Sequence, residues 1–401
     1  MKALATSVEG IDRSPIRFIL DRAAAFPDAI HLEIGQPDFG PPAHVIEAAV
    51  RAVREDYTGY TANAGMIELR EAIVVKLARE NNLHVTPKNV MVTVGAMQAV
   101  YSTMTVLMNP GDEILLPDPG YGNFAMAAQL GHAVPRFYPT LPSRDFEPDM
   151  EALEGLVTER TRVLFINSPS NPTGAVYSEK IMRACLDFCW RHDLYLVSDE
   201  TYDRLVFEGE HISPAQWDHE GRVVSIFTTS KSYAMTGWRV GYAVASEPVI
   251  TAMSKIQEPM TSCVNTVAQH GAIAALLGPQ DCVETMRTEY RRRRDLAVEL
   301  ALENELSVSY PHGAFYMLVD ISAQPKDSIS FCCDLLEAEH LAVAPGRSFG
   351  ERCDGYVRIS LCADAASLEA GIPRLADYLH RLSDRARPAS CVCRATAAAG
   401  S

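Results

Sequence analysis

Short apolar segments of strand length alternate with amphipathic segments of helix length through the middle of this chain. The predicted strands are 90–94, 113–116, 162–166, 194–197, 223–227 and 240–244, and helical patterns cover 66–82, 95–108 and 180–192. Strands that are apolar throughout are buried on both faces, and helices between them allow parallel pairing. We therefore expect an α/β fold built on a mostly parallel sheet with helices on both sides.

The pattern changes at about residue 278. A long charged helix over 279–303 leads to strands at 316–320 and 356–360, with a helix between them and a last helix ending near residue 382. This arrangement predicts a second, smaller α+β domain. The division that we expect is an N-terminal arm with part of the small domain (1–40), a large cofactor-binding domain (41–277), a small C-terminal domain (278–387) and a disordered tail (388–401).

Charge and composition exclude several classes of protein. The formal net charge of −15 argues against nucleic-acid or anionic-membrane binding. The one basic run, 291–294, has acidic neighbours and is interpreted as a solvated helix face. No apolar run approaches the roughly 20 residues of a membrane span, and the N-terminus lacks the apolar core of a secretory signal. The ten cysteines lack zinc-site spacing, so we expect no metal and reduced thiols in a cytoplasmic protein.

A lysine in a hydroxyl-rich turn follows the strand predicted at 223–227. Arg239 comes eight residues after Lys231, and glycines stand at 237 and 241. A lysine in such a loop can lose its proton and form a Schiff base, and an arginine can bind a phosphate bidentately. An amine beside a phosphate clamp is what an enzyme needs to hold pyridoxal 5′-phosphate (PLP). Ordinary surface charge is the alternative, so other segments must supply partners for the cofactor ring.

Two loops follow predicted strands, where parallel α/β sheets bind ligands. Gly95 opens a helix, and the N–H groups of Ala96 and Met97 would hold a phosphate at its N-terminus. A routine tight turn is the alternative there. Asn171 precedes a proline, which favours an extended backbone and an outward amide able to donate to a phenolate oxygen. A simple turn is again the alternative.

Other polar and aromatic residues extend this set. A carboxylate at Asp199 would keep the proton on a pyridine nitrogen, although a helix N-cap is the alternative. Tyr202 is placed to reach the same phenolic oxygen as the amide above. Tyr121 has the face on which a planar ring stacks, or else it only packs. Thr228 and Ser230 offer hydroxyls to a phosphate, or are merely turn formers.

The order and spacing of these segments resemble the class I/II aminotransferases of PLP-dependent fold type I, near the aspartate/aromatic aminotransferase group. The similarity runs from about 30–39 to 357–360. Its most specific parts are Asn-Pro-Thr-Gly, Ser-Asp-Glu-x-Tyr and Ser-Lys-x-x-x-Met-Thr-Gly-Trp-Arg. The resemblance implies a large domain with a mostly parallel seven-stranded sheet between helices, and a smaller α+β domain.

The resemblance also implies a role for individual residues. Lys231 is similar to the lysine that forms the Schiff base, and Asp199 to the acid on the pyridine nitrogen. Tyr60 corresponds to a tyrosine that reaches the phosphate of the neighbouring subunit, which implies a homodimer with shared sites. Arg358 is similar to the arginine that binds the substrate α-carboxylate, with Gly35 a nearby backbone contact; an exposed edge position is the alternative for Arg358. The other implied cofactor contacts are Gly95, Ala96, Met97, Tyr121, Asn171, Tyr202, Thr228, Ser230 and Arg239, with Tyr202 also catalytic and Asn171 also near the substrate.

The implied activity is transfer of an amino group between an α-amino acid and a 2-oxo acid, by a ping-pong mechanism through pyridoxamine phosphate with Lys231 as general base. The alternatives are β- or γ-elimination or oxidative deamination on the same scaffold. A PLP-containing transcription regulator is disfavoured, since only about 30 residues precede the first motif. The substrate stays open: no second arginine is obviously placed for a distal carboxylate, and the candidate pocket residues are Ile16, Ile34 and the N-terminal arm.

Overall fold

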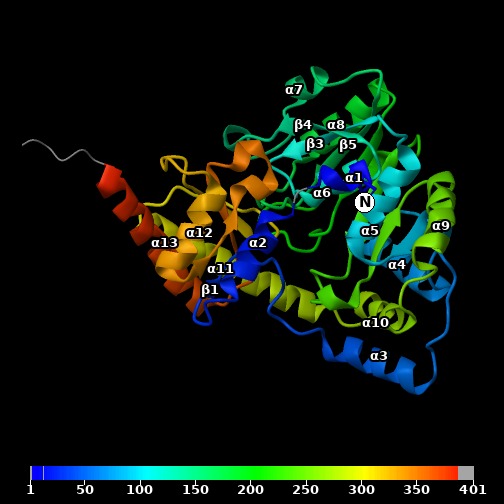
Figure 1. Cartoon of the computed structure of the whole chain (residues 1–401). Coiled ribbons are helices and arrows are strands. Elements are labelled where there is room, and N and C mark those ends of the chain that lie inside the picture. Colours follow the sequence, from blue (N-terminus) through cyan, green and yellow to red (C-terminus); the bar gives the residue numbers. More distant parts are fainter. Residues whose placement is uncertain (1, 12, 387–401) are drawn as a thin grey trace, which may run out of the picture.

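Seven strands form the largest sheet, in the order β2-β8-β7-β6-β5-β3-β4. Strands β3, β4 and β5 of this sheet are labelled in Figure 1. The computed structural model describes residues 2–11 and 13–386, so the predicted tail lies outside the described residues. Strand β8 is antiparallel to both neighbours, and every other neighbouring pair is parallel. The predicted mostly parallel seven-stranded sheet is therefore confirmed. Its strands are β2 (Val90–Thr93), β3 (Glu113–Asp118), β4 (Val134–Pro139), β5 (Thr161–Asn167), β6 (Tyr195–Asp199), β7 (Val223–Thr228) and β8 (Gly241–Val244).

Six of these strands match the predicted ones to within two residues, whereas the apolar pattern did not predict β4. Strand β4 lies at the sheet edge, and most of its residues are partly or fully exposed. It also contains Pro135 and Pro139, which an edge strand tolerates because one side of its backbone pairs with nothing. An edge strand needs no continuous apolar run, so it leaves little signal in the sequence.

Both faces of the sheet are covered because successive strand side chains point in opposite directions. Val163 and Phe165 pack with helices α5, α6 and α9, while Leu164 and Ile166 pack on the other face with α8. Helix α3 lies along α10 at the periphery (Figure 1). The helices of this part are α3 (Ala43–Arg54), α4 (Ile67–Glu80), α5 (Gly95–Leu107), α6 (Asn123–Leu130), α7 (Met150–Glu154), α8 (Glu179–Arg191), α9 (Glu247–Thr261) and α10 (Thr266–Leu277), with 3-10 turns η1 (Pro87–Asn89), η2 (Pro142–Arg144), η3 (Pro214–Trp217) and η4 (Thr236–Trp238).

A second group of elements gathers beside this sheet (Figure 1). Its core joins Ile19 and Leu32 from the N-terminal segment to Met317, Ile359 and Leu375 near the other end of the chain. The predicted domain boundaries stay a prediction. The elements are a three-stranded antiparallel sheet β11 (Ala344–Pro345), β12 (Tyr356–Ser360) and β9 (Tyr316–Asp320), the parallel pair β1 (Ile30–His31) and β10 (Leu341–Ala342), helices α2 (Pro15–Ala23), α11 (Asp281–Glu303), α12 (Ser328–Glu339) and α13 (Ala365–Ala386), and turns η5 (Gly346–Phe349) and η6 (Glu351–Cys353). The short helix α1 (Thr6–Glu9) lies against α6 of the large-sheet part instead (Figure 1).

The interpretation of the basic run 291–294 as a solvated helix face is wrong for half of it. Arg293 is 5% exposed and Arg294 is 1% exposed. Arg293 binds Asp38 at 2.8 Å, and Arg294 binds Glu208 at 2.9 Å. Because an α-helix turns through about 100° at each residue, four consecutive side chains cannot share one face. Two of them therefore point into the protein, where each guanidinium is paired.

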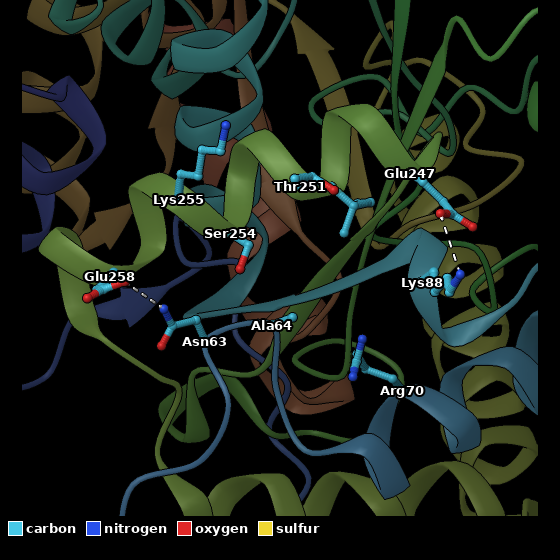
Figure 2. Close-up of a pocket in the computed structure, with 10 residues that line it drawn as sticks. Asn63, Ala64, Arg70, Lys88, Glu247, Thr251, Ser254, Lys255 and Glu258 are labelled. Carbon is cyan, nitrogen blue, oxygen red and sulfur yellow. Dashed lines mark hydrogen bonds and ion pairs between the residues drawn. The ribbon is translucent and has the colours of Figure 1, made fainter.

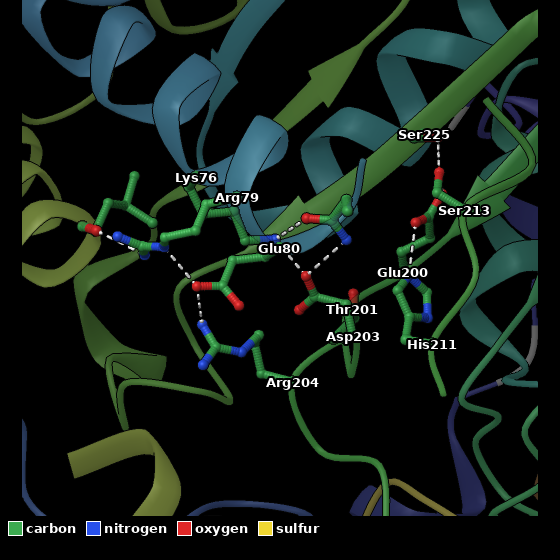
Figure 3. Close-up of polar contacts among 12 residues, drawn as sticks. Lys76, Arg79, Glu80, Glu200, Thr201, Asp203, Arg204, His211, Ser213 and Ser225 are labelled. Carbon is green, nitrogen blue, oxygen red and sulfur yellow. Dashed lines mark hydrogen bonds and ion pairs between the residues drawn. The ribbon is translucent and has the colours of Figure 1, made fainter. Parts of the chain in front are cut away.

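Two buried carboxylates hold the turn that follows β6 (Figure 3). Glu200 accepts a hydrogen bond from Ser213 Oγ at 2.9 Å and lies 2.8 Å from His211 Nε2. Asp203 forms an ion pair with Lys76 of α4. Burial by itself raises the pKa of Asp203, but the charges of Lys76 and His211 outweigh it and the pKa falls below its usual value. The turn is thereby tied to α4 and to the segment around His211.

Candidate active site

The topology of the large sheet brings the predicted cofactor residues to one edge. In the strand register Asn167 is opposite Asp199, and Gly241 is opposite both Thr228 and Thr93. Because β8 alone runs in the reverse direction, its amino end lies at the same edge of the sheet as the carboxyl ends of β2, β5, β6 and β7. The predicted residues on or beside these strand ends are Gly95, Ala96, Met97, Asn171, Asp199, Tyr202, Thr228, Ser230, Lys231 and Arg239.

The guanidinium of Arg239 lies against the N-terminus of α5. Gly95 has a φ of +72°, and a Cβ at this position would overlap Nη2 of Arg239. A Cβ on Gly241 would lie 2.6 Å from the backbone nitrogen of Ala96. The first N–H groups of a helix have no acceptor within the helix, and they favour an anion. The two glycines therefore let a guanidinium and free N–H groups lie close together.

Two hydroxyl groups extend this set of donors. Thr228 and Ser230 are buried, and their hydroxyl oxygens lie 2.9 Å apart. Thr228 Oγ1 also lies 2.9 Å from the carbonyl oxygen of Val240, the residue after Arg239. Hydroxyl, guanidinium and helix N-terminal N–H groups are the donors that bind phosphate oxygens. The chemistry of this donor set and the glycine positions fit a phosphate group.

The amine of Lys231 belongs to a half-buried side chain and lies next to this set of phosphate donors. Its Nζ donates a hydrogen bond of 2.7 Å to the carbonyl oxygen of Gly35. The ring centroids of Phe315 and Tyr202 lie 5.5 Å and 5.9 Å from Nζ. Burial lowers the pKa of Lys231 to about 8, and the positive charge of Arg358 acts in the same direction. The side chain therefore has a substantial neutral fraction near pH 8, as a nucleophile or base requires.

Asp199 and Tyr202 occupy the turn after β6. Asp199 Oδ1 accepts hydrogen bonds from the backbone nitrogen of Thr201 at 3.0 Å and from its hydroxyl at 2.6 Å. Burial raises the pKa of Asp199 to about 6, and the Thr201 donors oppose that rise. The hydroxyl of Tyr202 lies 2.9 Å from that of Tyr316, and burial raises the pKa of Tyr202. At neutral pH the turn thus presents a carboxylate and a neutral phenol.

Arg358 does not occupy an exposed edge, so that alternative is wrong. Strand β12 is the middle strand of its sheet, and Arg358 is 2% exposed. Its Nη1 donates to Asn171 Oδ1 at 3.0 Å, and its Nη2 donates to the carbonyl oxygen of Glu33. Its Cζ lies 4.2 Å from the ring centroid of Tyr316 and 4.8 Å from that of Phe349. Within the described residues its Nε is buried and has no hydrogen-bond partner.

Tyr316 and Glu33 are functional candidates that the sequence did not indicate. Tyr316 begins β9, and a Cβ on Gly35 would overlap its hydroxyl group. The absence of a side chain at Gly35 therefore allows the hydroxyl group of Tyr316 to lie close to the backbone of Gly35. The predicted strand at 316–320 includes Tyr316, but no local sequence pattern indicates that the Tyr316 side chain contacts Tyr202. Glu33 contributes only its backbone carbonyl oxygen to this group of residues, and a backbone atom gives no signal in the pattern of side chains.

The two remaining predicted residues differ in their surroundings. Tyr121 follows β3, and its hydroxyl accepts a hydrogen bond from Asn123 Nδ2 at 2.9 Å. Its ring meets Phe124 edge-on at a centroid distance of 5.5 Å. Tyr60 is 93% exposed, so the single chain does not bring it to the other predicted residues. Its loop is held in place where Thr266 donates to the carbonyl oxygen of Gly59 at 2.6 Å.

A surface pocket of about 440 Å³ lies between α9 and the start of α4 (Figure 2). Lys88 and Glu247 form an ion pair of 3.8 Å in its wall, and Asn63 donates a hydrogen bond of 3.3 Å to Glu258. None of the predicted site residues lines it. Within residues 2–11 and 13–386, no helix is long and apolar enough to cross a membrane, and no group of three or more His, Cys, Asp or Glu is placed to hold a metal.

Known proteins resemble the chain over most of its length. A family model described as aminotransferase class I and II matches residues 27–375. The aspartate/prephenate aminotransferase of Thermus thermophilus is 40% identical over 357 residues, which is 88% of this chain and 92% of that protein. The aspartate aminotransferase of Bacillus subtilis is 37% identical over 369 residues, which is 90% of this chain and 93% of that protein.

Solved structures agree with this family match. The aspartate aminotransferase from Thermus thermophilus with maleate has a TM-score of 0.90 at 37% identity, covering 94% of this chain and all of that one. The aromatic aminotransferase from Pyrococcus horikoshii has a TM-score of 0.86 at 37% identity, covering 90% and 99%. The predicted fold class and transamination are confirmed, and the lyase and oxidative alternatives are not favoured. The chain therefore belongs to the class I and II aminotransferase family and is an enzyme, a transaminase.

Proposed function

We propose that this transaminase binds PLP through Lys231 and exchanges an amino group between an α-amino acid and a 2-oxo acid by a ping-pong mechanism. One observation supports this most strongly. A half-buried lysine with a lowered pKa lies at the same sheet edge as a buried carboxylate and a donor set that fits a phosphate. These are the three groups that a pyridine aldehyde phosphate requires from a protein.

Each end of the cofactor has proposed partners. Asp199 would pair with the ring nitrogen, and the face of Tyr121 would stack on the ring. Asn171 and Tyr202 would donate to the phenolic oxygen. Arg358 and the backbone of Gly35 would orient the substrate carboxylate. The proposed phosphate ligands are Gly95, Ala96, Met97, Thr228, Ser230 and Arg239, with Tyr60 from a partner subunit.

When bound, PLP supplies a carbonyl group that accepts the amino group and a ring that takes up the electron pair of the α-carbon. The neutral amine of Lys231 removes the proton from the α-carbon and later returns a proton. Arg358 holds the α-carboxylate so that this carbon faces Nζ of Lys231. Asp199 is ionised above about pH 6 and holds the positive charge of the ring nitrogen.

A half-reaction tests the proposed mechanism. Mixing the PLP-loaded enzyme with an amino acid, without any 2-oxo acid, should release about one equivalent of 2-oxo acid per active site and then stop. Stopped-flow absorbance and chromatography of the keto acid would measure this burst. Continued turnover with release of ammonia would contradict transamination. In the steady state, double-reciprocal plots of rate against amino-acid concentration should give parallel lines at different fixed concentrations of the 2-oxo acid.

We propose a homodimer that shares its active sites through Tyr60. Exposed apolar side chains precede this residue in the chain: Tyr57 is 51% exposed and Val53 of α3 is 56% exposed. Ile46 and Val50 of the same helix are also exposed. Their spacing of i, i+4 and i+7 puts Ile46, Val50 and Val53 on one face of α3, and an exposed apolar face marks an interaction site. A second copy of the chain would cover it and bring Tyr60 to the partner's phosphate.

Mixed dimers test this arrangement. Tyr60→Ala should weaken PLP binding about 10-fold, because one hydrogen bond to a charged phosphate is lost. Refolding this variant with Lys231→Ala produces heterodimers in which one site has both native residues. At a PLP concentration that saturates only native sites, the mixture should reach about one quarter of wild-type activity, by random pairing of two chains. Activity no higher than the mean of the two homodimers would contradict shared sites.

We propose that the amino-acid substrate carries a second carboxylate. The relatives named above for aspartate support this, and Arg17 of α2 supplies a candidate cation. Burial raises the pKa of Tyr121, whereas the charges of Arg358, Arg17 and Arg239 lower it. Arg17 is exposed, and its charge acts on the residue proposed to stack on the cofactor.

Replacing Arg17 tests this choice of substrate. Arg17→Gln should raise KM for aspartate about 10-fold, the effect of one charge-assisted hydrogen bond, and leave KM for alanine unchanged. Steady-state kinetics with both amino acids would measure it. Arg13→Gln is the matched control, since Arg13 is exposed near the same helix and pairs with Asp21. Equal changes for both substrates would show that Arg17 does not select the side chain.

We propose a cytoplasmic location for the enzyme. Eight cysteines lie in the described residues, and none of the eight forms a disulfide there. Free thiols are typical of reducing compartments.

A further inference from the structure

Asp199 is held by one neighbouring residue, Thr201. The backbone nitrogen and the hydroxyl of Thr201 both donate to Oδ1 of Asp199, at 3.0 Å and 2.6 Å. Asp199 is 6% exposed and Thr201 is 7% exposed. Across residues 2–11 and 13–386, no donor bonds to the other carboxylate oxygen, Oδ2. One oxygen is therefore fully engaged, and the second is left for a ligand.

The two bonds differ in what they require of the sequence. The amide bond closes a turn that almost any residue at position 201 could make. The hydroxyl bond needs Ser or Thr, and it is the shorter of the two. A hydrogen bond to an ionised oxygen is stronger than one to a neutral oxygen, so the hydroxyl stabilises the carboxylate over the carboxylic acid.

Charged and titratable groups face Asp199 from several directions. Glu200 is adjacent in the chain and is engaged by His211 and Ser213. Lys231 approaches from the loop after β7, and the phenols of Tyr121 and Tyr202 are also close enough to act on it. Burial has the largest effect on Asp199 and raises its pKa. The hydrogen bond from the Thr201 hydroxyl has the next largest effect and lowers the pKa. Glu200 raises the pKa and Lys231 lowers it, both by less.

We propose that Thr201 is a positioning residue for catalysis, whose hydroxyl fixes Oδ1 of Asp199, directs Oδ2 toward the cofactor ring nitrogen and keeps the carboxylate ionised at neutral pH. The inference rests on the proposed binding of PLP. Without the hydroxyl, Asp199 would take up a proton at higher pH, and a protonated acid cannot balance the charge of a pyridinium ring.

The pH dependence of PLP affinity tests the role of the hydroxyl. Thr201→Val removes the hydroxyl at nearly constant volume, and Thr201→Ser retains it. The midpoint at which affinity falls in acid should rise by about one pH unit in Thr201→Val, which makes PLP binding about 5-fold weaker at pH 6. Thr201→Ser should follow the wild type. Fluorescence titration of the apoenzyme with PLP from pH 5 to 9 would measure both.

A readout without cofactor separates this effect from general damage. ¹³C NMR of the aspartate carboxyl carbons, with Asp199→Asn to assign the signal, should show the pKa of Asp199 about one unit higher in apo Thr201→Val. Thr201→Ala is a second hydroxyl-free variant and should show the same shift. A PLP analogue with carbon in place of the ring nitrogen should bind wild type and Thr201→Val equally.

The outcomes distinguish the inference from the proposed function. Wild-type enzyme that fails to bind PLP would overturn the proposed function. Wild type that binds PLP, with no shift in a folded Thr201→Val or Thr201→Ala, would overturn the role of the hydroxyl alone. A shift of equal size in Thr201→Ser would also overturn it, because that variant keeps the donor.

Discussion

Lys231→Ala should lower kcat by at least about 10⁴-fold, since it removes both the amine that binds the cofactor and the proposed base. The physical reason lies in the position of Nζ, which donates to the carbonyl oxygen of Gly35 and lies beside the rings of Phe315 and Tyr202. No other lysine contacts this group of residues in the described part of the chain: Lys76, which is buried, pairs with Asp203. Steady-state rates and the visible absorbance of the PLP-loaded protein would measure the loss.

Lys180→Ala provides the matched control for that change. Lys180 lies on the exposed face of α8, so its replacement should leave rate and absorbance unchanged. Borohydride treatment of the PLP-loaded wild type, followed by peptide mass spectrometry, should locate the cofactor on Lys231. Turnover of Lys231→Ala above about 1% of wild type would contradict its role as base, given the size expected for general base catalysis. Circular dichroism would show whether the variant is folded.

Arg358→Gln should raise KM for the amino acid by about 100-fold or more and lower kcat less. A substrate carboxylate bound by a guanidinium gains two charge-assisted hydrogen bonds, and each contributes roughly 1.5–3 kcal/mol. The low exposure of Arg358 strengthens these bonds because little water competes with them. Steady-state kinetics with varied amino acid would separate the effect on KM from that on kcat.

Cofactor affinity and a second arginine serve as controls for Arg358. PLP binding should change little in Arg358→Gln, because this residue is proposed to contact substrate and no phosphate oxygen. Arg352→Gln replaces an exposed arginine in η6 and should leave KM unchanged. An unaltered KM in a folded Arg358→Gln would contradict the carboxylate role. Thermal unfolding would detect destabilisation from leaving Asn171 Oδ1 without its partner.

Regular elements of the large sheet were predictable because they follow local rules. Six strands and helices such as α5 (Gly95–Leu107) and α8 (Glu179–Arg191) matched their predicted ranges to within two residues. Their signal is a continuous apolar run or a helical period, and both are local properties. Strand β4 lacks such a run. The buried arginines 293 and 294 were misjudged, because burial depends on what packs against α11 and not on its charge pattern.

The chemical identity of the candidate site was determined by the sequence alone. The lysine, the acid, the amide and Arg239 stand in loops after predicted strands, whereas Arg358 stands within the predicted strand at 356–360. Those residue types carry their chemistry wherever they are placed. The motifs also identify the family, because several short motifs occur together along one chain.

Only the tertiary structure decided how these groups act on one another. The pKa of Lys231 falls to about 8 because segments around residues 35, 202 and 315 exclude water from its amine. The contact of Tyr316 with Tyr202 and that of Arg358 with Asn171 each join residues more than a hundred positions apart. Desolvation and such contacts depend on strand register and on packing between distant segments. No local pattern of residues encodes them.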